Sequence, residues 1–362
     1  MSKIVFDEKE LELVGRMPAF GDPEALGAPI YKFPISPKEE VKKLYNKESD
    51  WMFTGTEWGL FSPKVIPDDV ARGFVFEAEM IPMEEFGGPD MFGVEWEYVP
   101  VVGGSMVRPG KPLFTDVNEW KEKLLPVWPN PDEWDWEGSA KANKEFLNNG
   151  QATLLWLLNG AWFERLISFM EFEDAAVALI DEDQEDALKE LLQKLTDLYC
   201  HIVDKCVEAY GDGIVGFTVH DDWGSQRAPF FSKEAARNLI VPYMKQFTDH
   251  VKSKGMIADF HSCGHIEDQI ENIIAAGWQS WTPMAMNDTK KLYEEYGDQI
   301  IISICDNDIA PGTPVEEQVK QAKEFASKYY SPDKPSVFSY MYAAGALTDD
   351  YRAALYEATR KM

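Results

Sequence analysis

The sequence is poor in several residue types and patterns that would point to particular protein classes. Only four cysteines occur in 362 residues, so Cys200, Cys206, Cys263 and Cys305 are expected to be thiols, metal ligands or core residues rather than a disulfide scaffold. No apolar run approaches the ~20 residues of a membrane-spanning helix. The opening segment MSKIVFDEKELELVG lacks the apolar core of a signal peptide. We therefore expect a cytoplasmic protein.

Basic residues are also scarce, with 35 Lys and Arg against 63 Asp and Glu and a formal net charge of −28. Nucleic acids and anionic membrane surfaces require clustered cations, so neither is an expected partner, whereas a basic or neutral protein partner is compatible with this charge. The sequence has no Gly-x-Gly-x-x-Gly after a strand, no P-loop and no Gly-x-Ser-x-Gly elbow. Nucleotide-driven and serine-hydrolase chemistry are therefore poorly supported.

From residue 151 onwards, apolar strand patterns alternate with helix patterns, which is typical of a parallel α/β fold. Strands are expected at 152–158, 214–219, 256–260, 278–281, 300–304 and 336–340, and long helices at 184–210 and 232–254. A capping box at 313–316 and Thr348 predict two further helix starts. With two more units from residues 70–150, the pattern predicts a single-domain (β/α)₈ TIM-type barrel spanning residues 1–362.

Residues 1–150 are irregular and rich in Trp, Pro, Gly and acidic residues, and we expect them to form a cap and the first barrel elements. Short helices are predicted at 37–46 and 117–124, with a hairpin or short sheet from the alternating segments 73–82 and 93–102. Seven tryptophans fall in this part: Trp51, Trp58, Trp96, Trp120, Trp128, Trp134 and Trp136. They either hold an irregular segment together or form the wall of a pocket for an aromatic ligand.

The pair His261 and Cys263 follows an apolar strand pattern, and Gly264 then lets the chain turn closely. Alternate residues on an extended strand point the same way, so both side chains can face one point. Imidazole and thiolate are ligands that zinc prefers, and parallel α/β folds place active sites at strand ends. The pair therefore predicts a zinc site, although a structural histidine beside a buried thiol is the alternative.

A zinc site needs further ligands, and Cys305 is the first candidate because it ends a strand pattern two strands further on. A core cysteine is the alternative for this residue. Among carboxylates, Glu234 opens the helix after the 214–219 strand and Asp222 lies near that strand's end. Both are candidate ligands.

The run His220-Asp221-Asp222 occupies another strand end. A carboxylate there can act as a general acid or orient a histidine, so these three residues are candidate catalytic groups. A helix-capping or loop hydrogen-bonding role is the alternative.

The stretch from about Asn159 to Gly277 resembles the uroporphyrinogen decarboxylase superfamily. The matching pieces are NGAWFERLISFMEFEDA, HDDWGSQRAPFFSKEAARNLIVPYMKQFTDHVKSKG and HSCGHIEDQIENIIAAG, with a weaker match through ISICDNDIAPGTPVEEQV. The resemblance covers roughly half of the chain. It implies a (β/α)₈ barrel with the site in the barrel mouth.

The superfamily contains cofactor-free decarboxylases of tetrapyrroles and corrinoid-dependent methyltransferases that hold zinc with an HxC pair and a later cysteine. This chain looks like the second kind, because it has the HxC pair and lacks an Arg-rich N-terminal segment for a polycarboxylate substrate. It departs from the methylcobamide:coenzyme M enzymes at the last strand, where SVFSYMYAAG contains no cysteine. This departure favours the aryl methyl ether O-demethylases.

The resemblance thus implies transfer of a methyl group from a methoxylated aromatic to the cob(I)amide of a corrinoid partner protein. Zinc held by His261, Cys263 and Cys305 would assist, Asp222 would supply a proton, and Trp162, Tyr340 and Tyr342 would contact the substrate. A uroporphyrinogen-type decarboxylase and a non-catalytic corrinoid- or tetrapyrrole-binding protein are the alternatives. Methylthiol, methylamine and methanol are also compatible methyl donors.

Overall fold

The computed structural model describes residues 5–17, 27–101, 104–304, 310, 312–339 and 348–362. The chain divides into two compact units, each described by itself below. The terminal unit comprises Met1–Gly59, Gly150–Ala152 and Gln279–Met362, and the central unit comprises Leu60–Asn149 and Thr153–Trp278. Strand β3 (Trp58–Phe61) contains one boundary between them. A single closed barrel over residues 1–362 stays a prediction.

Three parallel strands form the core sheet of the central unit: β7 (Ala152–Asn159), β8 (Gly216–His220) and β9 (Ile257–Ser262). All six residues of β9 and the first four of β8 are buried. Burial on both faces is typical of parallel strands covered by helices, and it explains the nearly continuous apolar runs in the sequence. The predicted strands at 152–158, 214–219 and 256–260 are confirmed with small shifts of their ends.

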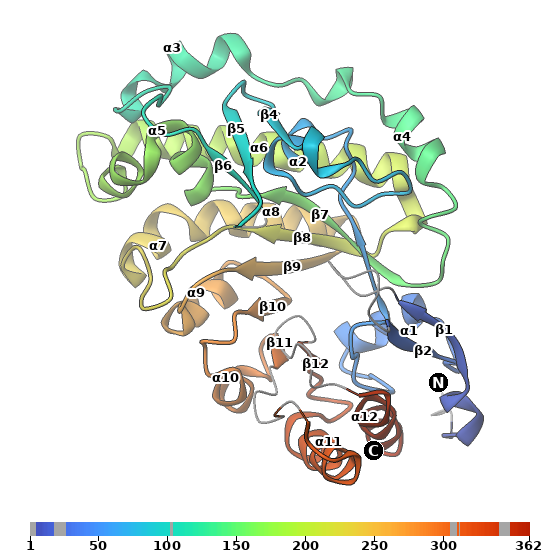
Figure 1. Cartoon of the computed structure of the whole chain (residues 1–362). Helices are drawn as coiled ribbons and strands as arrows, with labels where there is room; N and C mark the ends of the chain where they lie inside the picture. Colours follow the sequence, from blue (N-terminus) through green and yellow to red (C-terminus); the bar gives the residue numbers. More distant parts are fainter. Residues whose placement is uncertain (1–4, 18–26, 102–103, 305–309, 311, 340–347) are drawn as a thin grey trace. The chain divides into compact units, whose positions relative to one another are not determined.

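Helices cover this sheet (Figure 1), and the longest of them are α5 (Phe163–Ala178), α6 (Glu185–Tyr210) and α8 (Val241–Ser253). Helix α6 confirms the helix predicted at 184–210 and buries one apolar stripe, made up of Leu188, Leu191, Leu192, Leu195, Leu198, Ile202, Val203 and Cys206. Helices α6 and α8 pack side by side, and α8 contacts β9. This layer fixes the strands whose carboxyl ends carry the polar residues discussed below.

The single helix predicted at 232–254 is wrong, because the structure has two helices there. Helix α7 (Lys233–Leu239) ends before Ile240, and α8 begins at Val241 with Pro242 in its first turn. A proline ring cannot donate a backbone hydrogen bond and clashes with the preceding turn. Pro242 therefore starts a new helix instead of continuing the old one.

The remainder of the central unit precedes β7 or lies between its longer elements. It contains α2 (Pro67–Arg72), β4 (Gly87–Pro89), β5 (Glu95–Val99), β6 (Gly104–Val107), α3 (Trp120–Leu124), α4 (Trp136–Asn143), α9 (Ile270–Ala275) and the short 3₁₀ segments Met83–Glu85, Val117–Glu119, Leu125–Val127, Pro131–Glu133, Gly211–Gly213 and Glu267–Gln269. Segment 93–102 supplies β5 of the short antiparallel sheet β4–β5–β6, as predicted, but segment 73–82 is not one of its strands. Residues 73–82 make only an isolated bridge, between Phe76 and Ser62.

The terminal unit contains a second set of parallel strands, β10 (Ser280–Pro283), β11 (Ile301–Ile304) and β12 (Val337–Phe338), with β11 paired to both others. Its other elements are η1 (Glu8–Leu11), β1 (Leu13–Met17), β2 (Ala28–Tyr31), α1 (Pro37–Tyr45), α10 (Thr289–Tyr296), α11 (Val315–Tyr329) and α12 (Asp349–Arg360). Three of the predicted strands, at 278–281, 300–304 and 336–340, thus lie in this unit.

Both predicted helix starts in the terminal unit are confirmed, since α11 begins at Val315 and α12 at Asp349. The Thr348 side chain accepts a hydrogen bond from Tyr351 N–H and caps α12. The capping box at 313–316 is wrong, because Pro314 is the N-cap of α11 and the Thr313 hydroxyl donates backwards to Ala310 O.

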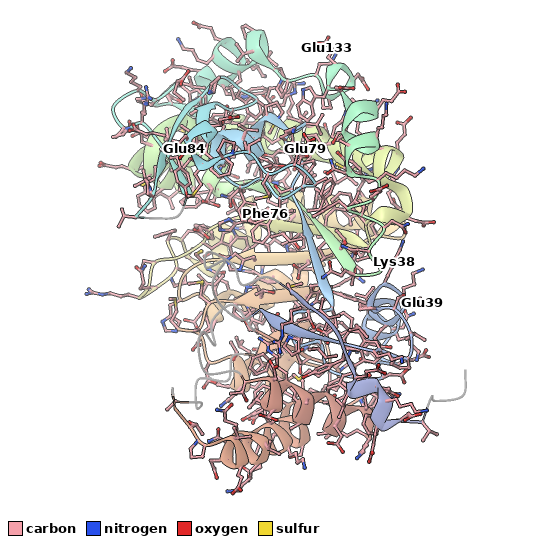
Figure 2. All side chains as sticks on the ribbon, turned by 45° about the vertical axis from the view of Figure 1, so that its right-hand side comes forward. Lys38, Glu39, Phe76, Glu79, Glu84 and Glu133 are labelled. Carbon is pink, nitrogen blue, oxygen red and sulfur yellow. The ribbon has the colours of Figure 1, made fainter. Side chains whose placement is uncertain are left out.

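The excess of acidic residues is displayed on the surface of each unit. Glu79, Glu84 and Glu133 of the central unit are exposed (Figure 2), as are many glutamates on its helices.

Of the helices in the described ranges, none has the length and apolar content needed to cross a membrane. Several of the N-terminal tryptophans are packing residues, since Trp51, Trp96 and Trp120 are buried.

Candidate metal centre

Strand register aligns three polar residues at the carboxyl ends of the central sheet. Asn159 of β7 is paired with His220 of β8, and His220 is paired with His261 of β9. Parallel strands in register place such residues side by side at one edge of the sheet. Cys263 follows His261 by two positions, just beyond the end of β9.

His220, His261 and Cys263 bring three metal-binding atoms together within 4.8 Å of one another. Cys263 Sγ lies 3.6 Å from His261 Nε2 and 3.9 Å from His220 Nε2. In a tetrahedral zinc site, the standard bond lengths put a nitrogen ligand about 3.6 Å from a sulfur ligand. This cluster can therefore hold a metal ion such as zinc, and its donor types fit one. The structure brings His261 and Cys263 together as their spacing predicts, and it adds His220.

A hydrogen bond at Nδ1 sets the orientation of the His220 ring. His220 Nδ1 donates to the side-chain oxygen of Asn159, because that oxygen can only accept. Metal-binding histidines commonly donate their second ring nitrogen to an oxygen in this way, which fixes the tautomer and the ring plane. His220 Nε2 is thereby directed towards the cluster.

Two carboxylates, Glu164 and Asp222, lie beside His220. The three residues form a second group that could hold a metal ion. Asp222 Oδ1 is 2.5 Å from His220 Nε2, and Glu164 Oε2 is 3.9 Å from the same nitrogen. Burial and the charge of Asp222 raise the pKa of Glu164 to about 7. Burial alone would raise the pKa of Asp222, but the neighbouring His220 imidazolium lowers it to about 2. The two carboxyls therefore differ in protonation near neutral pH, which is the arrangement that acid–base chemistry requires.

A backbone hydrogen bond also holds Cys263 in place, just after the end of β9. Its N–H donates to Asp222 Oδ1 at 2.6 Å. Gly264 then takes a φ of 93°, and a Cβ there would overlap the backbone of Gly224. Burial raises the pKa of the Cys263 thiol, with His220 opposing the shift. A cation at the cluster would favour the thiolate, because metal binding displaces the proton.

Asp221 does not face the cluster. It accepts hydrogen bonds from the backbone N–H groups of Ala161, Trp162, Phe163 and Glu164 at 3.0 to 3.2 Å and from the Trp223 indole at 2.9 Å. These donors use both of its oxygens, and the side chain is fully buried. Asp221 therefore caps the start of α5 instead of facing the metal-binding atoms.

Trp162 is also placed away from the cluster. Its indole N–H donates to Thr196 of α6 at 3.1 Å, and its ring packs against Tyr199, Phe247 and Trp278. It belongs to the helix layer, because it sits at the N-cap of α5 beyond the strand end. Trp156 of β7 is the aromatic residue at the cluster, with its ring centroid 5.9 Å from those of His220 and His261.

The remaining predicted site residues lie elsewhere. Glu234 is exposed in the first turn of α7 and is not part of the groups of potential metal ligands among the described residues. Its helix starts after the twelve residues 221–232, which carry it away from the strand end. Cys305, Tyr340 and Tyr342 lie outside the described residues.

Comparisons with known proteins find a matching family model and a solved structure with a similar fold. The model of the uroporphyrinogen decarboxylase (URO-D) family matches residues 163–302, a stretch that includes His220, His261 and Cys263. The solved structure of a methyltransferase from Methanosarcina mazei is similar over 90% of this chain and 98% of that chain, with a TM-score of 0.56 and 14% sequence identity. No curated protein sequence matches the chain.

The predicted resemblance to the uroporphyrinogen decarboxylase superfamily is thus confirmed over residues 163–302. The chain also shares its α/β fold with a methyltransferase. At 14% identity this likeness establishes the fold alone.

Proposed function

We propose that the protein is a zinc-dependent methyltransferase that moves a methyl group from a methoxylated aromatic to the cob(I)amide of a corrinoid partner protein. The observation that carries the proposal is the cluster of His220, His261 and Cys263 at the carboxyl ends of β8 and β9. The URO-D family match and the fold shared with a methyltransferase support it.

In this proposal His261, Cys263 and His220 hold the zinc ion, and Cys305 is a further candidate ligand. A zinc ion bound there would supply Lewis-acid chemistry at the ether oxygen, which would make a phenolate a better leaving group. The ligand set here differs from the one first expected, since His220 contributes from β8 and Glu234 does not contribute. Asn159 keeps the His220 ring in place through its Nδ1 hydrogen bond.

The reaction breaks the bond between the methyl carbon and the ether oxygen, and the methyl group forms a bond to cobalt. The two electrons of the broken bond stay on the oxygen, which then takes a proton. Glu164 is the proposed proton donor of the two carboxyls, because it lies beside His220 and burial raises its pKa. Asp222 accepts a hydrogen bond from Cys263 N–H and so keeps this ligand oriented, while its contact with His220 Nε2 would be given up when that nitrogen binds zinc.

Removal of the metal is the direct test of this function. Purified protein is expected to contain about one zinc per chain, and chelation is expected to abolish methyl transfer from methoxyarenes to cob(I)alamin. Restoring zinc should restore the rate, measured by the absorbance change of the corrinoid.

The alternatives give different outcomes in the same experiment. A uroporphyrinogen-type decarboxylase would release carbon dioxide from its substrate with or without zinc. A non-catalytic tetrapyrrole-binding protein would bind the corrinoid without turnover. Either result, obtained with a broad panel of methyl donors, would contradict the proposal.

A further inference from the structure

Helix α5 is broken at Glu171. This residue has a φ of 66° and a ψ of 170°, a backbone conformation that residues other than glycine rarely adopt. Two contacts from an earlier segment hold the break in place. Gly110 N–H donates to Glu171 Oε1, and Leu113 N–H donates to Phe169 O at 2.8 Å. The rest of α5 therefore leaves the direction of its first turns.

The break brings the ring of Phe172 back towards the candidate metal centre. Residues nine positions apart in an uninterrupted α-helix are about 13 Å apart along its axis. The ring centroids of Phe163 and Phe172 are nevertheless only 6.1 Å apart. Phe163 immediately precedes Glu164, which adjoins the metal-binding residue His220. Phe172 also packs edge to face on Phe230, in the loop after β8, at 4.9 Å.

Large apolar side chains are exposed along this second part of α5 and just beyond its end. Phe172, Val177 and Ile180 have exposed fractions of 45%, 44% and 76%. Scattered exposed apolar residues are ordinary, but a group of them on one short segment marks a surface that another molecule covers. We refer to this segment, residues 171–186, as the 171–186 surface.

The 171–186 surface is also acidic, with no basic residue to balance it. The sequence has no Lys or Arg between Arg165 and Lys189, and Lys189 pairs with Glu185. In the part of the chain that the structure describes, none of the four exposed acids here makes an ion pair. These acids are Glu173, Glu182, Asp183 and Asp186.

This combination of groups selects the kind of partner. Like charges across an interface repel, so the 171–186 surface disfavours a second copy of this chain, a nucleic acid or an anionic membrane. Its complement is an apolar face edged with Lys and Arg. A protein interface has this arrangement, with an apolar centre and a polar rim whose charges match those of the partner.

A recess adjoins the same surface at Phe230. It has a volume of about 430 Å³ and is lined by residues 229–233, which follow β8, and by Asp268 and Gln269, which follow β9. Interfaces gain most of their affinity where a side chain of one protein fills such a recess in the other. Because β8 and β9 end at the candidate metal centre, a partner seated here lies close to that centre.

We propose that the 171–186 surface and the recess at Phe230 form the docking surface for a partner protein whose apolar face is edged with Lys and Arg. This inference deepens the proposed function and rests on it, because the partner is then the corrinoid protein. Its cobalt must reach a methyl group at the strand ends, and the docking surface begins beside them. Apolar side chains of the partner contact Phe172 and Ile180, and its cations face the surrounding acids.

The binding test uses the full chain and three labelled amphipathic helical peptides of roughly 18 residues as probes. The first has leucine on one face and lysine on the other. The second has glutamate in place of lysine, and the third has serine in place of leucine. Fluorescence anisotropy at low salt should show that the first binds at least about tenfold more tightly than either control and weakens as salt is added. Equal binding of the first and third peptides would overturn the inference.

A double variant and a matched control assign this binding to the 171–186 surface. Phe172→Ser with Ile180→Ser should weaken binding of the leucine–lysine peptide by about tenfold or more. Val127→Ser removes a valine of similar exposure, 48%, from another segment and should bind as the wild type does. Hydrogen exchange of the wild-type complex should show protection within 171–186. Unchanged affinity in the double variant, or protection confined to other segments, would contradict the docking surface.

A kinetic test separates failure of this inference from failure of the proposed function. With a cobalamin-loaded corrinoid protein as acceptor, the double variant should raise the KM for that protein about tenfold. Transfer to free cob(I)alamin should stay within about twofold, because the small acceptor needs no docking surface. An equal loss with both acceptors would overturn the inference. Absence of transfer to either acceptor by the wild-type protein would contradict the proposed function, while the peptide measurements would still decide the docking surface.

Discussion

Replacing Cys263 by alanine is expected to lower zinc content to a small fraction of one ion per chain and to slow methyl transfer by about 1,000-fold or more. A Lewis-acidic ion contributes several kcal/mol to stabilising the leaving oxygen, and each 1.4 kcal/mol corresponds to a factor of ten in rate. Cys263 Sγ is the only sulfur in the described cluster, and it lies within 3.9 Å of both imidazole nitrogens. Elemental analysis and the corrinoid assay measure the two effects.

A matched control is available on α6. Cys200 is a half-buried cysteine of that helix and is not part of the groups of potential metal ligands in the described ranges. Cys200→Ala should therefore keep both zinc and activity. Full activity in a zinc-free Cys263→Ala protein would end the metal hypothesis.

The neighbours Asp221 and Asp222 are expected to respond to the same substitution in opposite ways. Asp221→Ala leaves four backbone N–H groups at the start of α5 and one indole N–H without their acceptor. Each buried, unsatisfied donor costs about 1–3 kcal/mol, so we expect a loss of about 3 kcal/mol or more in the free energy of unfolding. Urea denaturation followed by circular dichroism measures it.

Asp222→Ala should cost only about 1 kcal/mol of stability, because this side chain is partly exposed and water can replace its contacts. Its effect should appear instead in zinc affinity and rate, with losses of about 10- to 100-fold, since Asp222 accepts from the backbone N–H of the ligand Cys263. An Asp221→Ala protein that is stable but inactive would instead show that Asp221 is one of the reacting groups.

The local patterns in the sequence predicted much of the central unit and part of its site. Buried parallel strands are apolar along their whole length, so β7, β8 and β9 were recognisable, and the polar residues ending them marked the edge where sites form. The two-residue spacing of His261 and Cys263 follows directly from strand geometry.

The contributions of Glu164 and Asn159 were missed because they depend on pairing between segments about 60 residues apart. Asn159 meets His220 only through the register of β7 with β8, and Glu164 meets it only because Asp221 fixes the start of α5. Their signal was present, since both flank a strand end in the segment NGAWFER. Trp162 in that segment was predicted to contact the substrate, and the structure shows its indole N–H donating to Thr196 of α6.

X-ray absorption at the zinc K-edge of the zinc-loaded protein tests the central claim most directly. Coordination by His220, His261 and Cys263 predicts two imidazole nitrogens at about 2.0–2.1 Å and at least one sulfur at about 2.3 Å. A shell made only of oxygen and nitrogen, or a sulfur shell that persists unchanged in Cys263→Ala, would contradict it.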